Sequence, residues 1–204
     1  MFRQEKNEKE PKPGPYEMPM KHSFSFTVKA IALFTSVATA LLVLAYHLWP
    51  LDWLMTCAIS FGTTAFHFVM RLVVGYTLPA LTHYDFDYNR PWFRPRKWEA
   101  PFYKKLKLHR WKGQLPTYAP DQFDLGSNSL HRVIQNMCGA ELVHEIIMVL
   151  SFLPLLLIPI FGTPGVFILT SLGAAAFDSV FVMAQRYNRP RVVKIYERQE
   201  ARCH

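Results

Sequence analysis

Two apolar runs joined by a very short turn occupy residues 140–185, AELVHEIIMVLSFLPLLLIPIFGTPGVFILTSLGAAAFDSVFVMAQ. The turn is Gly162-Thr163-Pro164, and the runs on either side of it cover 140–161 and 165–185. Each run is close to the ~20 residues that an α-helix needs to cross the hydrocarbon of a bilayer. A buried soluble bundle is the alternative, but runs this apolar with so short a connection favour a transmembrane hairpin.

A second pair of apolar runs lies nearer the N-terminus, at about 24–49 and 51–76, with Pro50 between them. We therefore predict an all-α integral membrane protein with four transmembrane helices arranged as two hairpins, because a helix satisfies its own backbone hydrogen bonds in lipid. The expected divisions of the chain are a mobile tail, a membrane domain and a second tail, at 1–23, 24–191 and 192–204.

The 23 Lys and Arg residues are distributed unevenly around these runs. Residues 1–23 hold five and the chain from Arg186 onward holds six, while the connecting segment 77–139 holds ten and the hairpin turns none. The positive-inside rule therefore predicts that both termini and the connecting segment are cytoplasmic. The formal net charge of +8 is explained by an anionic membrane surface rather than by nucleic acid, since the basic residues flank apolar spans and no recognition motif accompanies them.

The connecting segment 77–139 interleaves aromatic and basic residues, as in WFRPRKW at 92–98 and YKKLKLHRWK at 103–112. Trp and Tyr favour the headgroup zone of a membrane, and Lys and Arg bind anionic phosphates there. We interpret this segment as a partly helical interfacial cap that lies against the inner leaflet.

Five of the ionisable side chains within the apolar runs are candidates for a functional site. His67 and Arg71 lie in the second run, Glu141 and His144 begin the third, and Asp178 lies in the second half of the fourth. With the predicted orientation, all five fall near the cytoplasmic ends of their helices. Ionisable groups inside a membrane are costly to bury and mark functional sites by default, so we expect one shared polar pocket beneath the inner leaflet.

The spacing of these side chains predicts acid–base chemistry. Glu141 and His144 share a helix face, because residues three or four apart are neighbours on an α-helix. A His held by a carboxylate is the usual arrangement for a general base that removes a proton from an attacking hydroxyl. We predict that His144 is this base, oriented by either Glu141 or Asp178, and that His67 and Arg71 bind substrate.

Two other interpretations of these residues remain open. Arg71 paired with Asp178 or Glu141 is compatible with a purely structural buried ion pair. A metal centre built from His67, His144 and the two carboxylates is compatible with ligand chemistry. The second Glu-x-x-His motif that a di-iron helix pair needs is absent, and we predict no bound metal.

The fourth run ends in QRYNRPR at 185–191, in which three arginines surround a proline. Guanidinium groups donate in a fixed fork that suits phosphate or carboxylate, so this stretch is a candidate anion-binding site. An ordinary positive-inside flank is the alternative.

The chain resembles the glycosyl-4,4'-diaponeurosporenoate acyltransferase family, bacterial membrane enzymes of staphyloxanthin-type carotenoid synthesis. The resemblance covers roughly 84–191 and is carried by QRYNRPR, by AELVH at 140–144 and by the aromatic–basic stretches around 97–98 and 111–112. It implies transfer of a fatty acyl group onto a primary hydroxyl of a sugar attached to a membrane-embedded lipid. The matching residues are Trp111, Lys112, Glu141, His144, Gln185, Arg186, Asn188, Arg189 and Arg191.

From this resemblance we expect an O-acyltransferase of a bacterial cell membrane that uses acyl-CoA or acyl carrier protein as donor and has no other cofactor. The expected acceptor is a glycosylated isoprenoid or another glycolipid. Catalysis is expected from His144, Glu141 and Asp178, although Asp178 falls where the carotenoid enzyme has an amide. Substrate binding is expected from His67 and Arg71, which lie outside the match, and from Trp111, Lys112, Gln185, Arg186, Asn188, Arg189 and Arg191, of which the three arginines would orient the donor.

Two other functional classes fit the sequence. One is a non-catalytic lipid-binding or scaffold protein whose buried charges only fix helix packing. The other is a metal-dependent membrane oxidoreductase. A transporter is disfavoured, because the four predicted spans show no broken helix at the bilayer midplane.

Overall fold

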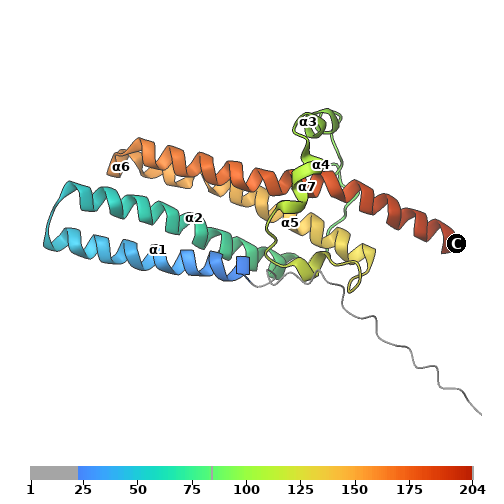
Figure 1. The fold of residues 1–204 in the computed structure, drawn as a ribbon, viewed down its shortest axis with the longest axis horizontal. Coiled ribbons are helices and arrows are strands. Elements are labelled where there is room, and N and C mark those ends of the chain that lie inside the picture. Colours follow the sequence, from blue (N-terminus) through green and yellow to red (C-terminus); the bar gives the residue numbers. More distant parts are fainter. Residues whose placement is uncertain (1–22, 84, 204) are drawn as a thin grey trace, which may run out of the picture.

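A computed structural model of the chain describes residues 23–83 and 85–203, so the expected tail at 1–23 lies outside the described residues except for its last position. Four long helices make up the molecule: α1 (Ser23–Leu48), α2 (Asp52–Thr82), α5 (Leu130–Leu150) and α7 (Pro164–Cys203) (Figure 1). The described chain contains no strand, and it has four helical segments long and apolar enough to cross a membrane. The predicted all-α architecture is confirmed.

The four helices form two hairpins. Helix α1 packs against α2, and α5 packs against α7, while α2 also packs against both α5 and α7 and so joins the hairpins. After α5, the second hairpin continues through η3 (Leu153–Leu157) and α6 (Ile158–Phe161), and the chain reverses at Gly162. Gly162 has a φ of +68°, a left-handed conformation that glycine adopts without steric cost. The turn predicted at Gly162-Thr163-Pro164 therefore lies where the sequence indicated.

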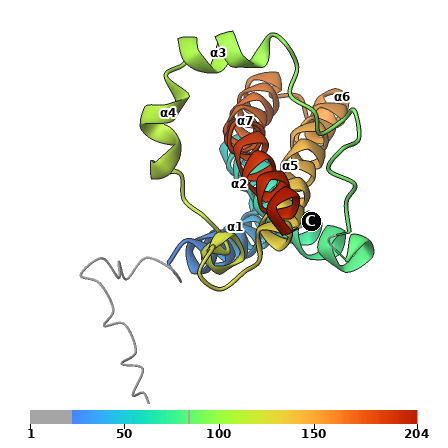
Figure 2. The same cartoon turned by 90° about the vertical axis from the view of Figure 1, so that its right-hand side faces the viewer.

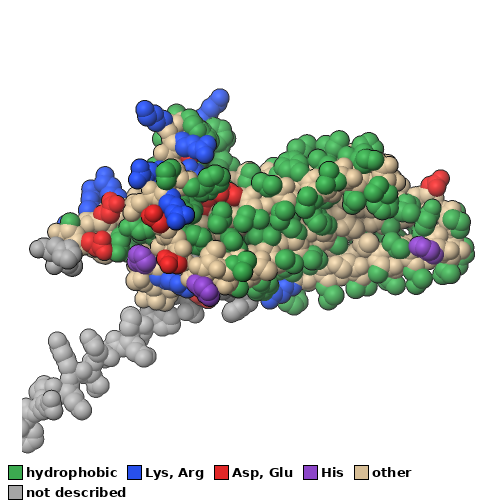
Figure 3. Space-filling view, turned by 180° about the vertical axis from the view of Figure 1, so that it is seen from behind, with side chains coloured by type: hydrophobic (Ala, Val, Ile, Leu, Met, Phe, Trp, Pro, Cys, Tyr) green, Lys and Arg blue, Asp and Glu red, His purple; other side chains and the backbone are tan. Residues whose placement is uncertain are grey.

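The outer surface of the bundle is apolar. Leu41, Val149 and Leu169 are 60%, 72% and 75% exposed, and many other large apolar side chains on the long helices are exposed as well. Figure 3 shows these side chains covering the bundle, with most charged side chains gathered toward one end. An apolar surface of this extent is unusual for a soluble monomer, whereas a surface in contact with lipid tails is expected to be apolar.

Helix α5 begins well before the apolar run that was predicted for it. Its first turns carry Gln135 and Asn136, which are buried and bonded within the protein. The Gln135 side chain accepts a hydrogen bond from the Phe86 amide (2.7 Å) and donates to the Phe86 carbonyl (2.9 Å), and Asn136 donates to the Gln122 carbonyl (2.6 Å). These polar turns belong to the helix because their partners come from the connecting segment, not from solvent.

Helix α7 runs through Pro190 to its end, although a separate tail was predicted at 192–204. A proline inside a helix removes one hydrogen bond and costs ~3 kcal/mol. Beyond it, Val193 and Tyr196 pack on a buried cluster that includes Phe93 of the connecting segment and part of α5. This packing favours continuation of the helix, which the charged composition of the tail did not indicate.

Residues 85–129, called the collar below, contain four short helical segments. These are α3 (Glu99–Lys105), α4 (Leu108–Trp111), η1 (Lys112–Gln114) and η2 (Pro120–Phe123). Seen along the bundle in Figure 2, the collar curves around α7 from the end of α2 to the start of α5. The predicted cap is thus partly helical, and its position at the inner leaflet stays a prediction.

Candidate active site

A cavity of about 1380 Å³ lies between the two hairpins. All four long helices line it, and residues 112–125 of the collar cover one end. Along α7 the lining extends from Leu169 to Val192, which is roughly 34 Å of helix at 1.5 Å per residue. Pockets for single small molecules are usually about 300–1,000 Å³. The cavity is therefore large enough for extended ligands.

A histidine–carboxylate pair stands at the middle of this cavity. The Nδ1 atom of His144 lies 2.8 Å from Oδ1 of Asp178, whose carboxylate is fully buried. The imidazole stacks on the Phe181 ring at 4.7 Å between centroids and 11° between planes, which fixes its orientation. Within the part of the chain that the structure describes, Nε2 of His144 has no hydrogen-bond partner. A carboxylate at Nδ1 favours the tautomer that leaves Nε2 unprotonated, and this nitrogen can act as a base.

Arg71 holds the other oxygen of the same carboxylate. Its guanidinium forms an ion pair with Oδ2 of Asp178 and also donates to the carbonyls of His67 (3.0 Å) and Ala174 (3.3 Å). This pairing neutralises the carboxylate and ties α2 to α7. Three helices thus meet at Asp178, as predicted for a shared pocket. We call His67, Arg71, His144 and Asp178 the cavity cluster, and all four line the cavity.

Several polar atoms of the cavity cluster have no partner. Both ring nitrogens of His67 and the Nε atom of Arg71 are buried and unbonded among the described residues. An unsatisfied buried polar group costs about 1–3 kcal/mol. The cluster therefore retains hydrogen-bonding capacity on the α2 side of the cavity.

Cationic groups line the end of the cavity beneath the collar. Lys112 donates to the Asn188 side chain and lies 4.8 Å from the Tyr187 ring centroid, while Arg191 stacks 4.0 Å from the same ring. Burial, and next the nearby charge of Arg191, lower the pKa of Lys112 below its usual value. Gln185 also lines this end, which we call the cationic mouth. Two cations held this close together favour binding of an anion between them.

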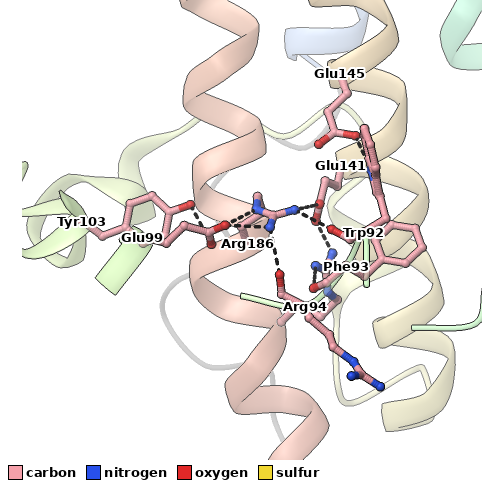
Figure 4. A network of polar contacts seen from close by, with 9 residues as sticks. Trp92, Phe93, Arg94, Glu99, Tyr103, Glu141, Glu145 and Arg186 are labelled. Atoms are coloured by element: carbon pink, nitrogen blue, oxygen red, sulfur yellow. Dashed lines mark hydrogen bonds and ion pairs between the residues drawn. The ribbon is translucent and has the colours of Figure 1, made fainter. Parts of the chain in front are cut away.

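A second set of charged side chains lies outside the cavity, in a network that we call the clasp: Glu99, Glu141, Arg186 and Arg189. Arg186 donates to Glu99 (2.7 and 3.0 Å) and to Glu141 (2.6 Å), and Figure 4 shows its guanidinium between these two carboxylates. It also donates to the collar carbonyls of Trp92 and Arg94, both at 3.0 Å.

The second arginine of the clasp completes the network. Arg189 forms an ion pair with the other Glu141 oxygen, donates to the Phe93 carbonyl and stacks on the Phe93 ring at 4.9 Å. The Tyr103 hydroxyl donates to Glu99 (3.3 Å), and burial, with a further contribution from Glu99, raises the pKa of Tyr103 to about 12. The clasp therefore ties α5, α7 and the collar together.

This geometry places four of the expected site residues away from the cavity. Glu141 was paired with His144 from its spacing, but both of its oxygens bind clasp arginines and it does not line the cavity. Arg186 and Arg189 were expected to orient a donor, but carboxylates and backbone carbonyls occupy them. Trp111 does not line the cavity either; its indole donates to the Leu106 carbonyl (3.0 Å).

Glu99 is the residue that sequence analysis missed. It is 2% exposed although it lies in a segment that was expected to be interfacial. One signal was present, because Glu99 is the only acidic residue in the strongly basic stretch 90–112. A single carboxylate among so many cations indicates a specific partner.

The four ligands considered for a metal centre are not brought together. Glu141 belongs to the clasp, and in residues 23–83 and 85–203 no group of three His, Cys, Asp or Glu side chains is arranged to hold a metal ion. The site that the structure assembles is the His–carboxylate pair with its arginine.

Four helices long and apolar enough to cross a membrane, with a His–carboxylate pair lining the cavity between them, define a helical membrane protein with a candidate active site. A family model described as glycosyl-4,4'-diaponeurosporenoate acyltransferase matches residues 89–198, more than half of the chain. The chain belongs to this acyltransferase family, and the resemblance carried by QRYNRPR and AELVH is confirmed. No curated protein and no solved structure matches the chain.

Proposed function

We propose that the protein is a membrane O-acyltransferase that moves a fatty acyl group from acyl-CoA or acyl carrier protein to a sugar hydroxyl of a lipid-linked acceptor. A glycosylated isoprenoid is the acceptor that the family description favours, and other glycolipids have the same chemistry. The observation that carries the proposal is the His144–Asp178 pair at the middle of a cavity that is cationic at one end and apolar at the other.

In the proposed reaction the acceptor hydroxyl attacks the acyl carbonyl directly. Nε2 of His144 takes the hydroxyl proton while the oxygen forms a bond to the carbonyl carbon. The carbon–sulfur bond of the donor then breaks, and the proton passes from the imidazolium to the leaving thiolate. Asp178 stabilises the imidazolium and keeps the ring in the productive tautomer, as a triad carboxylate does.

The cationic mouth suits the donor. Acyl-CoA and acyl carrier protein both present their thioester on a phosphate-bearing pantetheine arm. Lys112 and Arg191 would bind such a phosphate with charge-assisted hydrogen bonds, and the bound anion would offset the burial and the Arg191 repulsion that lower the pKa of Lys112. The thioester would then extend toward His144.

The proposed location is a bacterial cell membrane with both termini in the cytoplasm. The uneven distribution of Lys and Arg supports this orientation, which places the cationic mouth on the side where acyl-CoA and acyl carrier protein occur.

Lipid analysis of cells with and without the protein tests the activity, since acyl transfer adds the mass of one acyl chain to some glycolipid. His144→Gln should lower the rate by about 10²–10⁴-fold, the usual contribution of a general base, with equal amounts of folded protein. The matched control is His109→Gln, at an exposed position of α4. Unchanged turnover in His144→Gln would exclude the mechanism, and an unchanged lipid profile would favour the non-catalytic alternative.

A further inference from the structure

Two glycines within the long helices line the cavity at positions where a side chain would have free space. A Cβ atom added at Gly75 of α2 or at Gly173 of α7 would meet no atom within 4 Å, and both residues line the cavity. Gly62 differs, because its Cβ would lie 3.4 Å from Thr39 where α1 packs on α2. Glycine inside a helix costs about 0.5–1 kcal/mol relative to alanine. Neither close helix packing nor a positive φ requires glycine at these two positions, so a larger side chain there would extend into the open volume of the cavity.

Gly173 lies on the side of the His–Asp pair that is remote from the cationic mouth. It precedes Asp178 by five residues on α7, which is roughly 7.5 Å along the helix axis. This part of the cavity is apolar, and we call it the deep chamber. Its lining comes from three helices and includes Phe68, Val143, Ile147, Leu169, Gly173 and Ala174.

A buried polar side chain stands at the entrance to the deep chamber. His67 lies one turn from Arg71 on α2, in the direction of the chamber, and is 4% exposed. Neither of its ring nitrogens has a hydrogen-bond partner among the described residues, and the side chain borders the cavity. An unpartnered donor between a charged cluster and an apolar chamber indicates a ligand whose polar group is joined directly to a hydrocarbon chain.

We propose that the deep chamber holds the hydrocarbon tail of the acyl donor, with the acyl carbonyl accepting a hydrogen bond from His67, and that Gly173 keeps the path open for long chains. A fatty acyl thioester has the required shape, because its carbonyl carbon would lie at the His144–Asp178 pair and its methylenes beyond it. The chamber ends at the exposed Leu169, so the tail reaches the surrounding lipid instead of a closed wall. This inference rests on the proposed function for the identity of the ligand.

The test compares two donors in nanodiscs with the full chain. Gly173→Phe should lower the ratio of palmitoyl to octanoyl transfer by about tenfold or more, because a pocket discriminates by 10–200-fold over small changes in apolar chain size. Gly173→Ala fills less space and should give a smaller shift in the same direction. Gly165→Phe is the matched control, since this glycine is also on α7 with no atom within 4 Å of an added Cβ but does not line the cavity. A ratio equal to that of the wild type in both Gly173 variants would overturn the inference.

Binding provides a readout that does not depend on turnover. A palmitic acid analogue with a photoreactive group near the middle of its chain should label α7 around residues 169–173 in the wild type and in Gly165→Phe, but not in Gly173→Phe. Labelling without transfer of any chain would refute the proposed function and leave the deep chamber intact. Transfer with labelling elsewhere would refute the chamber and leave the function intact.

The role of His67 has its own signature. His67→Phe should slow palmitoyl and octanoyl transfer to the same extent, because the carbonyl is common to both donors, and His67→Gln should recover part of the rate by restoring a donor. Unchanged rates in His67→Phe would remove this hydrogen bond from the proposal.

Discussion

The clasp and the cavity cluster both join α7 to neighbouring segments through ionisable side chains, but they differ in how completely these side chains are bonded. In the clasp, Arg186 and Arg189 are matched by two carboxylates and three collar carbonyls. In the cavity cluster, buried nitrogens of His67 and Arg71 have no partner among the residues that the structure describes, and within the same residues only Nδ1 of His144 is hydrogen-bonded. A saturated network stabilises one arrangement of the chain, whereas an unsaturated network next to a cavity is suited to a ligand.

The clasp and the cavity cluster also differ in the expected effect of a change in protonation. The clasp contains two cations and two anions, all held in place, so a change of protonation there disrupts a structure. In the cavity cluster Arg71 pairs with one oxygen of Asp178 and His144 with the other, and the proposed mechanism needs His144 to exchange a proton with substrate while it keeps this contact. We therefore expect clasp variants to affect folding and cavity variants to affect turnover.

The largest effect is expected for Arg186→Met. Removing this cation leaves Glu99 and Glu141 buried without their main partner, and breaking a buried ion pair costs about 3–5 kcal/mol. Thermal unfolding of the protein in nanodiscs should show this loss, together with weaker protection of the collar from proteolysis. Arg198→Met, at an exposed position of the same helix, is the control and should leave the unfolding temperature unchanged. Equal stability of the two variants would mean that the clasp does not hold the collar.

The next effect is expected for Asp178→Asn. An amide at this position removes the charge that stabilises the imidazolium and also the partner of Arg71, so we expect about 100-fold slower acyl transfer, equivalent to ~2.7 kcal/mol of barrier. The measurement is turnover per folded molecule, with folding followed separately. If total activity falls only in proportion to the amount of folded protein, turnover per folded molecule is unchanged. Asp178 would then have a structural role, as the clasp residues have.

The smallest effect is expected in the pH dependence of folding stability, through Tyr103, whose hydroxyl donates to Glu99 of the clasp. Burial raises the pKa of the Tyr103 phenol from its ordinary value of 10.0 to about 12 in the folded protein, so the folded state retains a proton that the unfolded state loses. The stability from this group is present below pH 10 and is lost as the pH rises toward 12. Tyr103→Phe should remove this part of the alkaline loss of stability, measured by unfolding at several pH values. An identical pH profile in the variant would contradict the burial of the phenol.

Much of the fold could be predicted from the sequence, because the four apolar runs and the Gly-Thr-Pro turn are signals of composition. The grouping of Arg71, His144 and Asp178 could also be predicted, since charges are rare in such runs. The hydrogen-bond partners of Glu141 could not be predicted. Glu141 and His144 are three residues apart on α5, yet the carboxylate turns to arginines of α7, which only the packing of the two helices determines.

The ends of the helices could not be predicted for a related reason. The polar residues at the start of α5, such as Gln135, are typical of a loop in the sequence, and their place in the helix depends on hydrogen bonds to a distant partner, the Phe86 backbone. Pro190 is a local stop signal that distant apolar contacts override. Glu99 contacts α7 from a segment more than 80 positions away, as its bond to Arg186 shows, and no local pattern encodes such a pairing.

The length of α7 determines how far Asp178 lies from water, and therefore how exposed a reaction at this residue would be to competing hydrolysis. The helix has 40 residues and extends for roughly 60 Å, twice the ~30 Å thickness of bilayer hydrocarbon. With its first turn at the outer boundary of the hydrocarbon and its axis upright, Asp178 lies roughly 21 Å along it, or about 9 Å short of the inner boundary. Under the proposed function, an activated acyl group at that depth would meet few water molecules, so wasteful hydrolysis of the thioester would be suppressed. A sugar hydroxyl that enters would first have to shed its hydration, which would make dehydration of the acceptor part of the selection of substrates.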